Sequence, residues 1–265
     1  MAVVANLIKR TRRDFDAYSD LLTDSEKILS HNKVTGFSVN FPIAKTCRPS
    51  KVCANRCYFA KGGSSWPDSL KKQLRLFNST KADPLGTGDR LVGEIKRKFK
   101  KLTFIRWNGG GDLFPESVKM LHHCAKELPT LPFWVVTRIP EHASLVEELP
   151  NIFVHFSLDG KSLDRLKKYQ DISKKSQNYF FSYQCDKNEM PPTENLKGVS
   201  VVFFDGYKPK GEIDWMENDV VCPLNTRSDI FSAVRVVVIV SHCSCPLFWL
   251  RTAGVNTRQQ FISSA

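Results

Sequence analysis

The stretch Leu102-Thr-Phe-Ile-Arg-Trp107-Asn-Gly-Gly-Gly-Asp112 indicates the fold of this chain. Its first six residues include aromatic and β-branched side chains and predict a strand, and the glycines that follow predict a turn. Pro115 to Leu128 comes next, with Val118, Leu121, Ala125 and Leu128 at the spacing of an amphipathic helix. The stretch therefore predicts a strand, a glycine turn and a helix.

The same unit recurs along the chain. Strand-like and helical segments alternate in the order Phe133–Arg138, Glu141–Leu149, Ile152–Leu158 and Ser162–Ile172, and Tyr179–Tyr183 and Val199–Phe204 predict two further strands. Upstream, Val34–Pro42 predicts a first strand, and Ser69–Phe77 and Arg90–Lys100 predict two helices with basic outer faces. Such alternation predicts an α/β protein with a parallel sheet, either an open doubly wound sheet or a full or partial (β/α) barrel. We favour the barrel.

Polar residues stand where the predicted strands end: Asn108, Thr137-Arg138, Ser157-Asp159, Gln184-Cys185 and Asp205. Active sites of barrels gather at this rim, so we expect these residues to converge there. We also expect the Asn108–Asp112 turn to form one wall of a pocket beside the loop after the first strand, since consecutive glycines permit positive φ angles. The alternative is a plain turn in which Asp112 caps the helix beginning near Pro115.

Three cysteines, Cys47, Cys53 and Cys57, share one loop after the first predicted strand, with the spacing C-x5-C-x3-C. The residues between them are mostly polar or charged, which favours ligand thiolates over cysteines packed in a core. Such a set suits an iron–sulfur cluster or zinc. Three cysteines leave one iron of a cluster open, whereas structural zinc requires a fourth protein ligand.

The fourth position either stays open for a small molecule or is filled by a later cysteine. The candidates are Cys185, Cys222, Cys243 and Cys245, the last two beside His242. We favour Cys222. The late cysteines could also form a second metal site or lie reduced near a core strand. Cys124 differs, because its position on the face of a predicted helix is typical of a packing residue.

Composition indicates a soluble globular protein of 265 residues, 42% hydrophobic and 25% charged, without an apolar run of membrane-spanning length. Lys9, Arg10, Arg12 and Arg13 follow the short apolar start rather than lead it, which is unlike a signal peptide, so we expect a cytoplasmic location. We expect an N-terminal capping segment over 1–33, with Leu21, Leu22, Ile28 and Leu29 on a short helix. A barrel-like domain carrying the cysteine loop should span 34–210, and a cysteine-containing C-terminal extension 211–265.

The formal net charge is +12, with basic runs at Lys9–Arg13, Lys71–Arg75 and Lys96–Lys101. Such an excess favours a polyanionic partner, and nucleic acid is the usual one, although exposed lysines also serve solubility. The sequence has no zinc-finger, helix-turn-helix or other reading motif. The charge therefore predicts electrostatic contact without sequence-specific readout.

A three-cysteine loop after the first strand and a glycine turn after the second resemble the radical S-adenosylmethionine (radical SAM) superfamily. More closely, Cys57-Tyr-Phe-Ala60, Arg106-Trp107 leading into Gly111-Asp-Leu-Phe114, Thr137-Arg138 and Cys222-Pro223 resemble the phage "gene product eighty-eight" family. The likeness spans roughly residues 34 to 225. The superfamily's usual spacing is C-x3-C-x2-C, and its glycine turn usually ends in Glu.

The resemblance implies that Cys47, Cys53 and Cys57 hold a [4Fe-4S] cluster whose fourth iron binds SAM. It implies cofactor-binding roles for Gly109, Gly110, Gly111, Asp112 and Ser157, and a location in the host cytoplasm if the chain is viral. Three hypotheses follow: a SAM-dependent enzyme acting on nucleic acid or a nucleotide, a non-catalytic iron–sulfur protein that binds nucleic acid or senses redox state, and a zinc-stabilised binding module.

Overall fold

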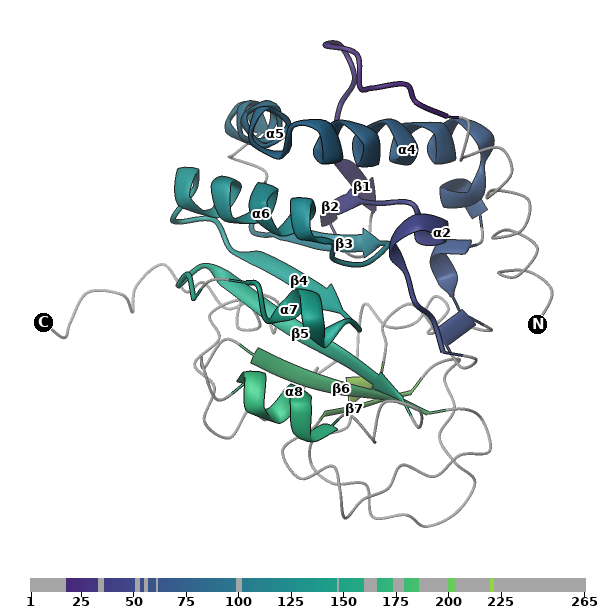
Figure 1. Cartoon of the computed structure of the whole chain (residues 1–265), viewed down its shortest axis with the longest axis vertical. Coiled ribbons are helices and arrows are strands. Elements are labelled where there is room, and N and C mark those ends of the chain that lie inside the picture. Colours follow the sequence, from purple (N-terminus) through teal and green to yellow (C-terminus); the bar gives the residue numbers. More distant parts are fainter. Residues whose placement is uncertain are drawn as a thin grey trace, which may run out of the picture.

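The computed structural model describes residues 18–32, 36–50, 53–54, 57–60, 62–98, 102–146, 148–159, 166–173, 179–185, 200–203 and 220–221. These residues form an α/β structure around an eight-stranded sheet in the order β1 to β8 (Figure 1). β1 and β2 are antiparallel, and every later neighbouring pair from β2 to β8 is parallel. The predicted α/β class with a parallel sheet is confirmed.

The strands are β1 (Ser30–Asn32), β2 (Gly36–Asn40), β3 (Ile105–Gly110), β4 (Phe133–Thr137), β5 (Ile152–Asp159), β6 (Tyr179–Cys185), β7 (Ser200–Phe203) and β8 (Val220–Val221). The helices are α2 (Ile43–Thr46), α4 (Pro67–Ala82), α5 (Pro84–Lys98), α6 (Pro115–Glu127), α7 (Pro140–Ala143) and α8 (Leu166–Ser173), with 3-10 turns η1 (Tyr58–Ala60) and η2 (Gly62–Ser65). Among the described helices, none is long and apolar enough to cross a bilayer.

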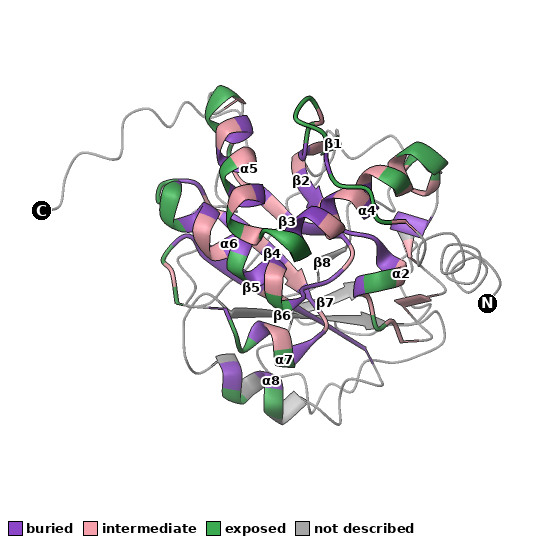
Figure 2. Ribbon diagram, turned by 45° about the horizontal axis from the view of Figure 1, so that its top comes forward, coloured by how far each residue is buried: buried purple, intermediate pink, exposed green. Residues whose placement is uncertain are grey.

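One face of the sheet packs against the helices and forms the core. Alternate strand residues such as Ile105, Trp107, Val135 and Phe156 are fully buried in one cluster with α5, α6 and α8 (Figure 2). Side chains of neighbouring strand positions point to opposite faces. The opposite face carries Arg106, Trp134 and His155 in a row, with the Arg106 guanidinium 5.3 Å from the Trp134 ring centroid and the Trp134 and His155 rings 6.0 Å apart.

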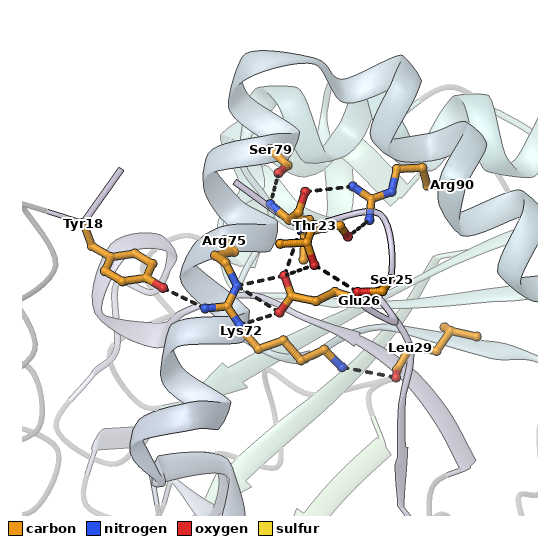
Figure 3. Close-up of polar contacts among 10 residues, drawn as sticks. Tyr18, Thr23, Ser25, Glu26, Leu29, Lys72, Arg75, Ser79 and Arg90 are labelled. Carbon is orange, nitrogen blue, oxygen red and sulfur yellow. Dashed lines mark hydrogen bonds and ion pairs between the residues drawn. The ribbon is translucent and has the colours of Figure 1, made fainter. Parts of the chain in front are cut away.

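The N-terminal segment, Tyr18 to Asn32, is not the short helix that its leucines predicted. Leu22, Ile28 and Leu29 are buried as predicted for a capping segment, but the chain is irregular and ends in β1. Apart from a turn at Thr23–Glu26, its backbone is bonded mainly by side chains of α4 and α5 (Figure 3). Because these side chains satisfy the backbone groups, the segment has no need of helical hydrogen bonds.

The helix predicted over Glu141–Leu149 is a single turn, α7. The Ser144 hydroxyl donates to the Glu141 carbonyl at 2.8 Å, and the Leu145 and Val146 amides bond three residues back, to His142 and Ala143. A serine that bonds the local backbone competes with the helical pattern. The helices predicted over Ser69–Phe77, Arg90–Lys100, Pro115–Leu128 and Ser162–Ile172 correspond to α4, α5, α6 and α8. The third strand of the sheet runs into the glycines, to Gly110.

Candidate functional site

The cysteine loop leaves the sheet at the carboxyl end of β2. The one-turn helix α2 follows, and the Cys47 amide donates to the Ile43 carbonyl at 3.1 Å, so Cys47 ends that helix. Ile43, Phe59 and Ala60 form a small buried cluster, against which Cys47, Ala54 and Cys57 pack. This cluster brings the first and last cysteines of the loop onto the same apolar support.

The Asn108–Asp112 turn lies directly against the cysteine loop, as its position after the neighbouring strand predicted. A Cβ on Gly110 would overlap the Phe59 ring. The Asp112 amide donates to Thr46 Oγ1 at 3.0 Å. Positive φ angles occur at Asn108 (64°) and Gly111 (85°), and not at Gly109 or Gly110. Gly110 is therefore needed for close approach to Phe59 rather than for an unusual backbone conformation.

Asp112 does not cap α6. Its Oδ1 accepts from Thr137 Oγ1 at 2.6 Å and from the Leu113 amide at 2.7 Å, and its Oδ2 accepts from the Arg138 amide at 3.1 Å. The start of α6 is bonded instead by the Ser117 hydroxyl. Burial raises the pKa of Asp112 to about 6, against the hydrogen bonds that lower it. Asp112 thus joins the turn after β3 to the end of β4.

The thiols of the cysteine loop are electrostatically coupled. Burial raises the pKa of Cys47 well above its ordinary value, and charge on Asp112, Cys53 and Cys57 raises it further. Burial also raises the pKa of Cys53, while the positive charge of Arg138 lowers it. All three cysteines carry thiols rather than disulfides. The loop therefore gathers three thiol groups within reach of each other's charge.

Across the described residues, no three His, Cys, Asp or Glu side chains converge at the spacing of a bound metal ion. Convergence on one point is what a single ion such as zinc requires. The cysteines of a [4Fe-4S] cluster bind different irons, so their sulfurs surround the cluster rather than meet at one position.

A buried ion pair at the ends of β4 and β5 also touches the cysteine loop. Arg138 Nη2 pairs with Asp159 Oδ2, and Arg138 Nη1 donates to Ser157 Oγ at 3.3 Å. The Ser50 hydroxyl, between Cys47 and Cys53, donates to Asp159 Oδ2. The predicted convergence of Arg138, Ser157 and Asp159 is confirmed. The contact with Ser50 was not predicted, because 109 residues separate Ser50 from Asp159.

The remaining cysteines divide into two groups. Cys124 is fully buried on α6 and its thiol donates to the Gly88 carbonyl at 3.7 Å, which confirms a packing position. Cys185 ends β6. Cys222, Cys243 and Cys245 lie outside the described residues, together with most of the predicted extension, so the choice of a fourth ligand stays a prediction.

Several basic side chains that the sequence predicted for an outer surface instead bond to groups of the protein itself. Arg75 forms an ion pair with Glu26, Lys98 bonds Glu94 at 2.6 Å, and Lys72 donates to the Leu29 carbonyl at 3.4 Å. Lys71, Lys96 and Arg97 are exposed. The basic runs on α4 and α5 therefore offer fewer charges to a partner than the sequence suggests.

The protein is of the α/β class. Its three-cysteine loop lies at the carboxyl edge of the parallel sheet, beside a glycine turn. Its family is shown by comparison: the model of the family described as Gene product 88 matches residues 10–196, and the chain belongs to that family. No curated protein and no solved structure matches it.

Proposed function

We propose that this protein binds an iron–sulfur cluster through Cys47, Cys53 and Cys57. The observation that carries the proposal is the placement of three free cysteines in one loop at the carboxyl edge of the sheet, where Cys47 and Cys57 pack on the same apolar cluster. Thiolates are the usual ligands of iron–sulfur clusters, and a loop based on a rigid strand holds them in place. A bound cluster would supply electron transfer or, at an open iron, a binding position for a small molecule.

The fourth ligand is either such a small molecule or a cysteine, with Cys222 favoured. Zinc held by four protein ligands is the alternative metal. Substitution of Cys185, Cys222, Cys243 and Cys245 one at a time, followed by electron paramagnetic resonance of the reduced cluster, identifies a ligand by its altered spectrum. An unchanged spectrum in all four variants assigns the position to a small molecule.

Radical SAM chemistry on a partial (β/α) barrel is the more specific form of the proposal. It is supported by the sequential order of parallel strands β2 to β8, which is the order of a barrel, and by the turn beside the cysteines. Both carboxylate oxygens of Asp112 already accept hydrogen bonds, from Thr137, Leu113 and Arg138. In this form SAM contacts the backbone of the turn and Ser157, and the substrate is a nucleic acid or nucleotide. The alternative is a non-catalytic iron–sulfur protein that binds nucleic acid or senses redox state.

Anaerobic reconstitution tests the proposal. We expect the wild-type chain to take up iron and sulfide, and the triple variant Cys47→Ala, Cys53→Ala, Cys57→Ala to lose both, because it lacks the ligands. Cys124→Ala is the matched control, since its thiol is buried on α6, and it should retain the cluster. A triple variant with full iron and sulfide would disprove the assignment, and zinc without iron would favour the binding module.

The same reconstituted protein separates the catalytic form from the non-catalytic one. SAM binding measured by calorimetry, followed by release of 5′-deoxyadenosine, supports radical SAM chemistry. Absence of SAM binding to the intact cluster form leaves the non-catalytic iron–sulfur protein. Contact with nucleic acid should be electrostatic, so affinity should fall steeply with salt. A binding constant that does not change with salt would contradict this.

A further inference from the structure

Hydrogen bonds hold the segment between the first two cysteines at its middle residue, Ser50. Besides donating to Asp159, the Ser50 hydroxyl accepts from the Cys53 amide at 3.1 Å, and the Ser50 carbonyl accepts from the Ala54 amide at 2.9 Å. Ser50 therefore begins the short turn that carries Cys53. Any movement of Ser50 would move Cys53 with it.

The partner of Ser50 lies several strands away. The loop starts after β2, whereas Asp159 ends β5, and β3 and β4 lie between these strands in the sheet. Neighbouring strands are about 4.8 Å apart, so the loop crosses a distance of about 14 Å. In Figure 1 the chain after α2 descends along the ends of the strands toward β5. Ser50 follows Asn40, the last residue of β2, by ten residues, which is chain enough for this crossing.

The far end of the crossing is rigid. Asp159 is fully buried, and the Arg138 side chain is 12% exposed. A buried carboxylate is stable when a cation and further donors satisfy its oxygens, and here Arg138 and Ser50 both do so. Arg138 is itself held through its backbone amide by Asp112 and through its guanidinium by Ser157. The pair thus connects the ends of β3, β4 and β5.

We propose that Arg138 and Asp159 are positioning residues for the cysteine loop: through Ser50 they fasten it across the strand ends and set the local charge around its thiols. This inference rests on the proposed function, because it identifies what holds the proposed cluster ligands in place. The contact of Ser50 with Asp159 can also be tested in the metal-free chain.

The first experiment uses the metal-free chain and measures the alkylation rate of each cysteine by mass spectrometry. Ser50→Ala changes no charge, so a faster reaction reports position alone. Loss of one such hydrogen bond, about 1 kcal/mol, corresponds to a rise of about fivefold at Cys53. Asp159→Asn should raise the rate further, while Cys124 stays protected. Glu141→Gln is the matched control, because Glu141 pairs with Lys168 at an exposed site, and it should leave the rates unchanged.

The second experiment uses the reconstituted cluster and measures its reduction potential. Removing a nearby cation disfavours the reduced form, so Arg138→Gln should shift the potential to a more negative value. Asp159→Asn should shift it to a more positive value, and Arg138→Lys should restore most of the wild-type value. A purely structural role would not produce shifts of opposite sign.

The outcomes separate the two proposals. A wild-type chain that binds no cluster overturns the proposed function, and the alkylation rates still decide whether Ser50 is fastened. Unchanged alkylation of Cys53 in Ser50→Ala overturns the positioning role, even if a cluster forms. Equal shifts of potential in the same direction overturn the charge-setting role.

Discussion

Two irregular segments of this protein are held in place by side chains, and they are held in different ways. The N-terminal segment, 18–32, lies on α4 and α5, whose side chains bond its backbone. Glu94 accepts from the Ile28 and Leu29 amides at 2.7 and 3.2 Å, and Arg90 donates to the Leu22 and Thr23 carbonyls. Buried leucine and isoleucine side chains complete the contact. These contacts hold the segment against the two helices.

Within its described residues, the cysteine loop contacts the rest of the fold through Thr46, Ser50 and Phe59, among others. The thiols themselves are placed where burial and each other's charge raise the pKa of Cys47. The comparison therefore teaches that the first segment is held along its own backbone by side chains of two helices, whereas the second is held at residues that lie between and beside its cysteines.

The largest expected effect comes from the N-terminal segment. Glu94→Ala leaves the buried Ile28 and Leu29 amides without their acceptor, at a cost of about 2 kcal/mol for each group. We expect the free energy of unfolding in urea to fall by about 4 kcal/mol, while alkylation of the folded cysteine loop stays as in the wild type.

Glu127→Ala is the control for this variant, because Glu127 forms an exposed pair with Lys96 at 3.9 Å. Its effect should be below about 1 kcal/mol. If Glu94→Ala instead exposed Cys53 in the folded protein, the two segments would not be independent.

A carboxyl group in the turn beside the cysteine loop and one in the N-terminal segment should affect stability with opposite dependence on pH. Burial raises the pKa of Asp112 to about 6, from an ordinary 3.8. The folded state then binds a proton that the unfolded state does not, so this group adds stability as the pH falls from about 7 to 4. At 1.36 kcal/mol for each pKa unit, its contribution is about 3 kcal/mol.

Glu26 shows the reverse behaviour. Burial raises its pKa, but hydrogen bonds from Arg75 and Thr23 outweigh burial and leave the pKa lowered. Its stabilisation is present above its unfolded pKa and is lost as the pH falls through the folded pKa. Unfolding curves from pH 4 to 7 for the metal-free wild type, Asp112→Asn and Glu26→Gln check both signs. A wild-type advantage over Asp112→Asn that shrinks toward pH 4 would contradict the Asp112 prediction.

The smallest effect tests the contact between the turn and the loop. Gly110→Val should displace Phe59, two residues after Cys57, and lower the free energy of unfolding by about 2 kcal/mol. Alkylation of Cys57 should accelerate at the same time. Gly93→Ala on α5 is the control, since a Cβ there meets only Arg97 Nη1 at 3.7 Å, and it should be neutral or slightly stabilising. Unchanged stability of Gly110→Val would mean that Phe59 does not rest on the turn.

Much of the site could be predicted from the sequence. The periodicity of residues 102–128 and the glycine run define a strand, a turn and a helix, and the parallel sheet then places the turn beside the cysteine loop. The packing role of Cys124 followed from its helical spacing. The capping role considered for Asp112 failed, because Thr137 and Arg138 of the next strand end compete for its carboxylate.

The sequence by itself thus determined the order of the strands from β2 to β7 and of the longer helices between them, the α/β class and the place of the three cysteines at a strand end. Each of these depends on local periodicity or turn chemistry. Only the tertiary structure decided that residues 18–32 are irregular, that Arg75 forms an ion pair with Glu26, and that Ser50 meets the Arg138–Asp159 pair. These contacts join side chains that are mostly tens of residues apart, and their strength depends on burial, which no local pattern of residue types encodes.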